Sequence, residues 1–288
     1  MLENINTVLG KINDFVWGVP LIVLILAAGI FLTIRLKGIQ VTKLGKGFKL
    51  MFAKVEQDGH GEISSFGALC TALSATIGTG NIVGVATAIV TGGPGALFWM
   101  WIAALFGTAT KFSECMLAVK YRTIAEDGHV VGGPFYYIEN GMGKNWKWLA
   151  KIFAFFGVCV GLFSIGTFTQ VNGISSAVKN FFDPDTKHVA FKLFGIEYSW
   201  TIVISGIILT ICVGLVIIGG LKRITNVAQV IVPFMAILYV ITALLVIIFN
   251  IDKVPGAFKE IIEGAFGLKA AAGGTLGAII VAMQKGIA

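Results

Sequence analysis

A run of glycine and polar residues interrupts an apolar segment, Phe66 to Thr91, that is long enough to cross a bilayer. The run reads Gly78-Thr79-Gly80-Asn81-Ile82-Val83-Gly84. Glycine weakens a helix, and unpaired backbone groups are costly in hydrocarbon, so an ordinary lipid-facing helix would not contain this run. The pattern is typical of a discontinuous helix, in which amides at the break face anions and carbonyls face Na⁺.

The glycines of this run allow two other interpretations. Gly80 and Gly84 have the small-xxx-small spacing of helix packing faces, which is a weaker interpretation because many polar atoms share the segment. The spacing Gly-x-Gly-x-x-x-Gly differs from the dinucleotide-binding fingerprint, and no βαβ unit surrounds it. A nucleotide-binding loop is therefore excluded.

Composition places the whole chain in a membrane. Hydrophobic residues make up 56% of it and charged residues 13%. The net charge of +7 does not indicate nucleic-acid binding, because the basic residues lie in short loops beside apolar spans. An enzyme is disfavoured, because the sequence shows no candidate nucleophile, metal cluster or paired intramembrane acids, and no cofactor is expected.

Hydropathy predicts six complete spans and part of a seventh. They cover Phe15–Ile34, Phe66–Thr91, Ala96–Tyr121, Leu149–Val178, Trp200–Gly220, Val227–Asn250 and Ala270 onward. Alternate connections are rich in lysine and arginine, as cytoplasmic loops are, whereas the others mix lysine with acidic residues. The N-terminus is therefore expected outside, and the glycine-broken span runs from cytoplasm to exterior.

Longer motifs surround the break and carry a family resemblance. They are Gly78 through Ile89, Gly92-Gly93-Pro94-Gly95-Ala96, Phe98-Trp99-Met100-Trp101, Lys111, Glu114, Tyr121-Arg122 and Gly132 through Glu139. Together they resemble the signature of the sodium:alanine/glycine symporter family, and the match covers essentially the whole chain.

The resemblance implies an all-α, polytopic membrane protein with a LeuT-type core of two inverted five-helix repeats and one extra N-terminal helix. Residues 1–65 would hold that helix and a basic cytoplasmic loop. Residues 66–250 would form the first repeat, with its broken helix at 78–84. Residues 251–288 would hold an external loop and the start of the second repeat, so the chain is expected to be truncated at its C-terminus.

The broken segment supplies candidate ligands for a zwitterionic amino acid and for Na⁺. Amides around Thr79, Gly80 and Asn81 suit a carboxylate, aided by the positive end of the following half-helix. Carbonyls near Ala75 and Gly78 and the side-chain oxygen of Asn81 suit Na⁺, a hard cation that prefers oxygen. The resemblance supports this, because Gly80-Asn81 matches a Gly-Asn pair of LeuT-type transporters whose asparagine helps to hold sodium.

The fourth predicted span contains a second polar cluster, which includes Thr167, Thr169, Gln170 and Asn172. Gln170 offers a donor and an acceptor, which suits the charged ends of an amino acid. By resemblance Gln170 is a substrate-contacting residue, and Phe168 helps to enclose the substrate side chain. The alternative is interhelical hydrogen bonding, worth about 0.6 kcal/mol per contact.

Lys111 and Glu114 are three residues apart in the third span, so they share a helix face and can pair. A structural ion pair is favoured over proton coupling through Glu114, because a cationic neighbour favours the ionised carboxylate.

The sequence therefore predicts a multi-pass plasma-membrane transporter that imports a small neutral amino acid, alanine or glycine, coupled to Na⁺ by alternating access. The predicted partners are the amino acid, Na⁺ and the lipid bilayer. A membrane assembly or structural subunit without transport stays open, since the second repeat is not expected in this chain. An ion channel is disfavoured, because the polar clusters indicate a closed binding pocket.

Overall fold

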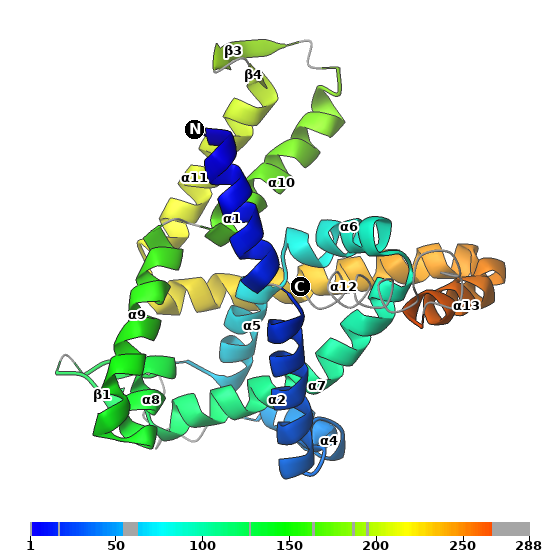
Figure 1. Cartoon of the computed structure of the whole chain (residues 1–288). Helices are drawn as coiled ribbons and strands as arrows, with labels where there is room; N and C mark the ends of the chain where they lie inside the picture. The colour runs from blue at the N-terminus through cyan, green and yellow to red at the C-terminus, as the bar shows by residue number, and fades with distance from the viewer. Residues whose placement is uncertain are drawn as a thin grey trace. The chain divides into compact units, whose positions relative to one another are not determined.

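The computed structural model describes residues 2–16, 18–53, 63–126, 128–162, 165–185, 188–193 and 196–266. The elements, shown in Figure 1, are mostly helices. They are α1 (Leu2–Val16), α2 (Val19–Arg35), α3 (Ile39–Thr42), α4 (Leu44–Met51), α5 (Ser65–Thr76), the 3₁₀ turn η1 (Thr79–Asn81), α6 (Val83–Gly92), α7 (Gly95–Lys120), β1 (Thr123–Ile124), β2 (Val130–Val131), α8 (Pro134–Met142), η2 (Lys144–Trp146), α9 (Lys147–Leu162), α10 (Ile165–Phe182), β3 (Val189–Leu193), β4 (Ile196–Ser199), α11 (Trp200–Ile217), α12 (Gly220–Phe249), η3 (Ile251–Lys253) and α13 (Val254–Ala265).

The glycine-rich segment is interrupted in the structure. The α5 helix starts at its N-cap Ser64, whose hydroxyl accepts a hydrogen bond from the Gly67 amide at 3.0 Å, and it ends at Thr76. Ile77 is extended, with φ −85° and ψ 109°. A single 3₁₀ turn, η1, follows, and α6 then completes the segment. Two half-helices thus replace one continuous helix.

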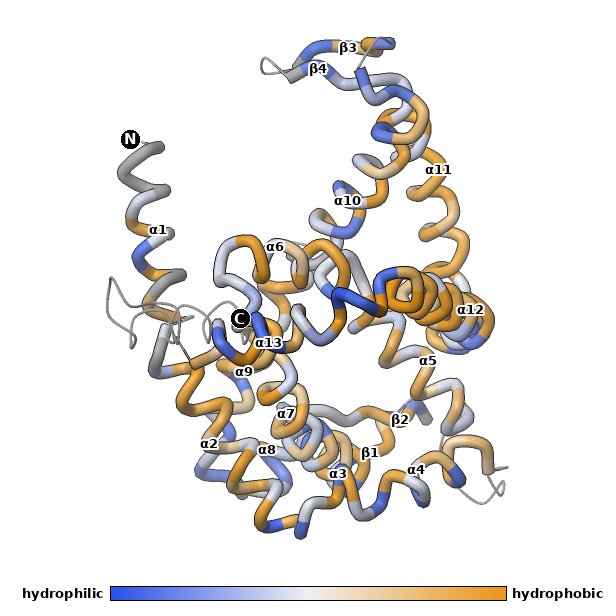
Figure 2. The backbone as a smooth tube through the Cα atoms, turned by 90° about the vertical axis from the view of Figure 1, so that its right-hand side faces the viewer, coloured by the Kyte–Doolittle hydropathy of each residue, from blue (hydrophilic) through white to orange (hydrophobic). Residues whose placement is uncertain are grey.

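Several helices are long and apolar enough to cross a membrane. They are α7, α11 and α12, together with the stretch Lys144–Phe182 that contains α9 and α10. Shorter apolar helices cover Pro20–Arg35, Ser65–Thr76 and Val83–Gly92. Figure 2 shows α11 and α12 coloured as hydrophobic along most of their length. The chain is a polytopic membrane protein, as its composition predicts.

The structure differs from the sequence expectation in three places. The predicted span from Phe15 is divided, because α1 ends at Val16 and α2 begins at Val19. The α12 helix begins at Gly220, seven residues before the expected Val227. Two short antiparallel hairpins, β1–β2 and β3–β4, depart from an all-α fold. The predicted seventh span, from Ala270 onward, lies outside the described residues.

The chain forms two compact units. The first comprises Met1–Leu50, Gly80–Tyr121 and Leu238–Ala288. The second comprises Met51–Thr79 and Arg122–Ile237, so it holds α5, the start of η1, α10, α11 and most of α12.

Close backbone approach holds the first unit together around α7. The position of a Cβ atom on Gly29 of α2 lies 2.8 Å from Cβ of Phe106. At the N-terminal end of α7, a Cβ atom on Gly95 would overlap the backbone of Gly264 and Ala265 in α13. The indole nitrogen Nε1 of Trp99 also donates to the carbonyl oxygen of Ala265 at 3.3 Å. Glycine at these positions therefore allows helices to meet through their backbones.

We expect Gly95→Ala to destabilise the protein by about 1–3 kcal/mol, because backbone atoms, unlike a side chain, cannot rotate away from the added methyl group. Gly107→Ala on the same helix is the matched control, since no described heavy atom lies within 4 Å of its Cβ position. Thermal unfolding in lipid nanodiscs measures both. Equal midpoints for the two variants would show that the α7–α13 contact does not contribute to stability.

A buried carboxylate fixes the connection between α10 and α11 in the second unit. Asp183, which directly follows α10, is 4% exposed. The hydroxyl of Ser199, the N-cap of α11, donates to Oδ2 of Asp183 at 2.5 Å, and the backbone amide of His188 donates to the same oxygen at 3.3 Å. The two helices run side by side beneath the β3–β4 hairpin (Figure 1). This network sets the position of α10, which carries Gln170.

Candidate functional site: the break in the α5–α6 segment

The break and α10 are joined by a hydrogen bond. The backbone amide of Thr79 donates to the side-chain oxygen Oε1 of Gln170 at 2.9 Å. This amide is freed because α5 ends at Thr76, three residues earlier. Gln170 lies in the first half of α10 and is partly buried. The structure therefore brings together two predicted site residues that are 91 positions apart in the sequence.

Two glycines allow this close approach. A Cβ atom on Gly78 would overlap the Gln170 side-chain amide, with Cδ and Oε1 of Gln170 each 2.8 Å away. On the other side, a Cβ atom on Gly173 would lie 2.6 Å from Cγ2 of Thr79. Gly173 and Gln170 are three residues apart in α10, so they occupy one helix face. Gly173 is not predicted from the sequence, because only the approach of α10 to Thr79 gives it a role.

The predicted Na⁺ ligands lie within seven positions of one another in the sequence, at the interruption. Ala75 lies in the last turn of α5, where the carbonyl dipoles of the half-helix point towards the break. Gly78 follows directly, and Asn81 ends the 3₁₀ turn ahead of α6. Backbone carbonyls and a side-chain amide oxygen are hard donors of the kind that Na⁺ prefers. Gly80 and Asn81 belong to the first unit, and Ala75, Gly78 and Thr79 to the second.

The structure gives no support to a packing role for Gly80 and Gly84. No described heavy atom lies within 4 Å of a Cβ position on either glycine. Close helix packing requires a partner backbone at that distance. Within the described part of the chain, these two glycines leave their faces open.

Phe168 is 72% exposed and does not share the face of Gln170. The two residues are two positions apart in α10, which places them about 200° apart around the helix axis. Phe168 is therefore not brought against the break by the described residues.

The ion pair predicted on α7 is confirmed. The ammonium Nζ of Lys111 donates to Oε2 of Glu114 at 3.0 Å. Both side chains are substantially exposed, at 64% and 40%.

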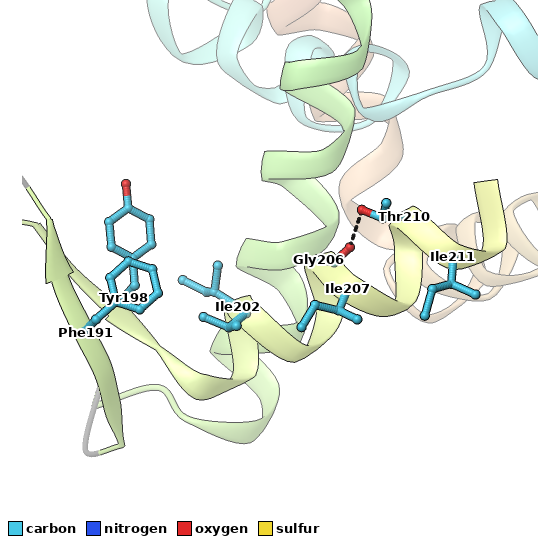
Figure 3. A pocket seen from close by; sticks show the side chains of 8 residues that line it. Phe191, Tyr198, Ile202, Gly206, Ile207, Thr210 and Ile211 are labelled. Atoms are coloured by element: carbon cyan, nitrogen blue, oxygen red, sulfur yellow. Dashed lines mark hydrogen bonds between the residues drawn. The ribbon is translucent and has the colours of Figure 1, made fainter. Parts of the chain in front are cut away.

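A groove on the second unit is a different feature. It is lined by Phe191, Tyr198, Ile202, Val203, Gly206, Ile207, Thr210 and Ile211, and Figure 3 shows that they come from the β3–β4 hairpin and one side of α11. The rings of Phe191 and Tyr198 stack at 5.1 Å. The Thr210 hydroxyl already donates to the Gly206 carbonyl at 2.8 Å. Among the described residues that line this groove none is charged, so they offer no partners for an amino acid's ends, and none is a predicted site residue.

Comparisons with known proteins bear on the whole chain. A model of the sodium:alanine symporter family matches residues 2–288. An uncharacterized transporter of Haemophilus influenzae is 50% identical over 99% of this chain and 58% of its own length. The sodium/alanine symporter AgcS of Methanococcus maripaludis is 42% identical over 98% of this chain and 59% of its own length. A probable sodium/glutamine symporter, GlnT of Bacillus subtilis, is 37% identical over 100% of this chain and 56% of its own length. The chain thus spans somewhat more than half the length of these relatives.

Proposed function

Since this chain belongs to the sodium:alanine symporter family, we propose that it takes part in the Na⁺-coupled import of a small neutral amino acid, alanine or glycine, by alternating access. The family is one of transporters, which confirms the prediction that the chain is not an enzyme. The sodium/alanine relative supports alanine as a substrate, and the sodium/glutamine relative makes glutamine the competitor to test.

The proposed architecture is the first repeat of a LeuT-type inverted-repeat core in the plasma membrane, with the N-terminus outside. In this division, residues 1–65 precede the repeat, residues 66–250 form it and residues 251–288 begin the second one. The order of apolar helices with an interruption in the segment Ser65–Gly92 supports the proposal.

The observation that carries the proposed site is the hydrogen bond from the Thr79 amide to Gln170 across the break. An amide that donates to a carboxamide oxygen would also donate to a substrate carboxylate oxygen, and more strongly because that acceptor would be charged. We propose that substrate takes this position from Gln170, whose side-chain amide then contacts the substrate. The amides of Gly80 and Asn81 complete the carboxylate site.

Na⁺ is proposed to bind beside the substrate through the carbonyls of Ala75 and Gly78 and the side-chain oxygen of Asn81. The negative end of the α5 half-helix favours a cation there, while the positive end of α6 favours the substrate carboxylate. Adjacent opposite charges at one break would couple the two binding events.

Uptake by proteoliposomes tests this function. They would hold either the chain itself or a chimera in which the residues of the Haemophilus influenzae relative beyond the match follow Ala288. We expect the chimera to accumulate alanine when Na⁺ is present and not when choline replaces it, with unlabelled glycine competing better than leucine or glutamine. Undiminished alanine uptake in choline would reject Na⁺ coupling. No uptake in either cation would favour the alternative, a membrane assembly subunit without transport.

Gln170→Ala should weaken alanine binding by about 1–3 kcal/mol, since it removes the side-chain amide that contacts the bound substrate. Calorimetry on the purified chimera measures the affinity. Asn172→Ala is a matched control on the same helix, because its exposed side chain lies about 200° from Gln170 around α10. Normal affinity with a lowered melting temperature in Gln170→Ala would assign Gln170 to helix packing instead.

A further inference from the structure

The half-helix that leads to the break is held at its middle by a pair of threonines. The hydroxyl of Thr71 in α5 donates to Oγ1 of Thr225 in α12 at 3.1 Å. The same Thr71 hydroxyl lies 2.8 Å from the carbonyl oxygen of Gly67 in its own helix. Thr225 is 2% exposed. This polar contact joins residues 154 positions apart, within the second unit.

The pair is closely packed: an apolar cluster lies beside it, and the Gln229 side-chain nitrogen lies against Gly67. Cys70, which is 1% exposed, packs with Ala228 and Val232 of α12, and Phe66 and Leu73 lie against this cluster. At the next turn of α5, a Cβ atom on Gly67 would lie 2.7 Å from Cγ2 of Thr225. Apolar packing alone leaves a short helix free to slide or turn, whereas a hydrogen bond between two side chains fixes direction.

Because α5 is short, the contact between Thr71 and Thr225 affects the position of the residues at the break. The helix is 12 residues long and ends at Thr76, so only the residues from Thr71 onward separate the contact from the break. At 1.5 Å per residue, the distance along the chain axis from Thr71 to the end of α5 is about 8 Å. A turn or tilt of α5 about its crossing with α12 therefore moves Gly78 and Thr79 against Gln170.

We propose that Thr225 is a positioning residue: through Thr71 it holds the α5 half-helix on α12 and thereby sets the position of the break opposite Gln170. The inference rests on the proposed function only in that the segment so positioned is the proposed substrate site. Thr225 touches neither substrate nor ion in this arrangement. Its effect on transport passes entirely through the placement of α5.

Cys70 provides a natural reporter, because it lies in the α5–α12 contact and is shielded by it. In a background where Cys115, Cys159 and Cys212 are replaced by alanine, maleimide labelling in nanodiscs measures how often the contact opens. Thr225→Val keeps the shape of the side chain and leaves Thr71 its acceptor at Gly67. We expect it to speed labelling of Cys70 about threefold, the factor typical of one interhelical hydrogen bond in a membrane protein. Thr225→Ser, which retains the hydroxyl, should restore the slow rate.

Two controls separate positioning from general loss of stability. Thr242→Val on the same helix removes a hydroxyl that donates to the Leu238 carbonyl at 2.8 Å, and it should leave Cys70 labelling unchanged. Adding Thr71→Val to Thr225→Val should cause no further increase, because both remove one bond. In the chimera, Thr225→Val should raise the alanine concentration for half-maximal uptake about threefold, with Thr225→Ser again normal.

Unchanged labelling in Thr225→Val, or equal acceleration in Thr225→Val and Thr225→Ser, would overturn the proposal. So would normal alanine dependence in Thr225→Val when the unsubstituted chimera transports alanine. The unsubstituted chimera could show no Na⁺-dependent uptake while the labelling pattern is as expected. That result would support the positioning of α5 by Thr225 and reject the proposed transport function. The two ideas are thus tested separately.

Discussion

Replacing Gly78 with alanine should lower the affinity for alanine about 5- to 150-fold, a loss of about 1–3 kcal/mol, because Gln170 can no longer meet the substrate. The added methyl group overlaps the side-chain amide of Gln170, whose Cδ and Oε1 lie 2.8 Å from the Cβ position. Gln170 must then leave the position in which it lies 2.9 Å from the Thr79 amide, and its side chain no longer reaches a substrate bound there. Calorimetric titration of the chimera with alanine at saturating Na⁺ measures the loss.

A second substitution makes this test specific. In Gly78→Ala with Gln170→Ala the overlap is absent, so the double variant should bind alanine no worse than Gln170→Ala alone, a clear departure from additivity. Gly157→Ala in α9 serves as a control, since no described heavy atom lies within 4 Å of its Cβ position. Additive losses at Gly78 and Gln170 would mean that their contact is not what alanine binding requires.

The interruption at residues 77–82 could be predicted from sequence because its cause is local. Glycine, threonine and asparagine at mid-span are costly in lipid wherever the rest of the chain lies, so the pattern alone indicates a break. The apolar spans have the same local character, and α7 and α11 agree with their predicted ranges to within three residues at each end. The pairing of Lys111 with Glu114 follows from helical spacing.

The start of α12 was misplaced for a physical reason. Lys222 and Arg223 suggested a connection before Val227, but both lie in the first turn of the helix. Long basic side chains can keep their charges in water while their stems follow an apolar helix, so charge did not mark the helix boundary. The shift matters, because Thr225 then lies inside α12 and can meet α5.

The partners of the break could not be predicted, because they depend on which helices meet. Gly173 and Thr225 have no unusual local pattern, and only the approach of α10 and α12 to α5 gives them a role. The sequence indicates that Gln170 is a polar residue at mid-span. Only the structure shows that its side-chain oxygen accepts a hydrogen bond from the Thr79 amide. Residues that are unfavourable in a lipid-facing helix show where the helix is interrupted. Which side chains contact the interruption depends on tertiary packing.

The largest effect on ion coupling is expected from Asn81→Leu, which keeps a similar volume and removes the oxygen that we assign to Na⁺. Even residues that only support metal ligands typically contribute about 10–100-fold to affinity, so loss of a ligand should raise the Na⁺ concentration for half-maximal alanine uptake by at least about 100-fold. Uptake by chimera proteoliposomes at increasing Na⁺, with choline keeping ionic strength constant, measures this shift.

Asn81→Asp and Gly84→Ala are the matched controls for the ion site. Asn81→Asp retains an oxygen ligand and should keep Na⁺-dependent uptake, since carboxylates also suit hard cations. Gly84→Ala changes the same segment where no described heavy atom lies within 4 Å, so it should alter neither Na⁺ dependence nor stability. Normal Na⁺ dependence in Asn81→Leu, with only its melting temperature lowered, would make Asn81 a structural residue of the η1 turn. Na⁺ would then have to bind through oxygen atoms other than the side-chain oxygen of Asn81.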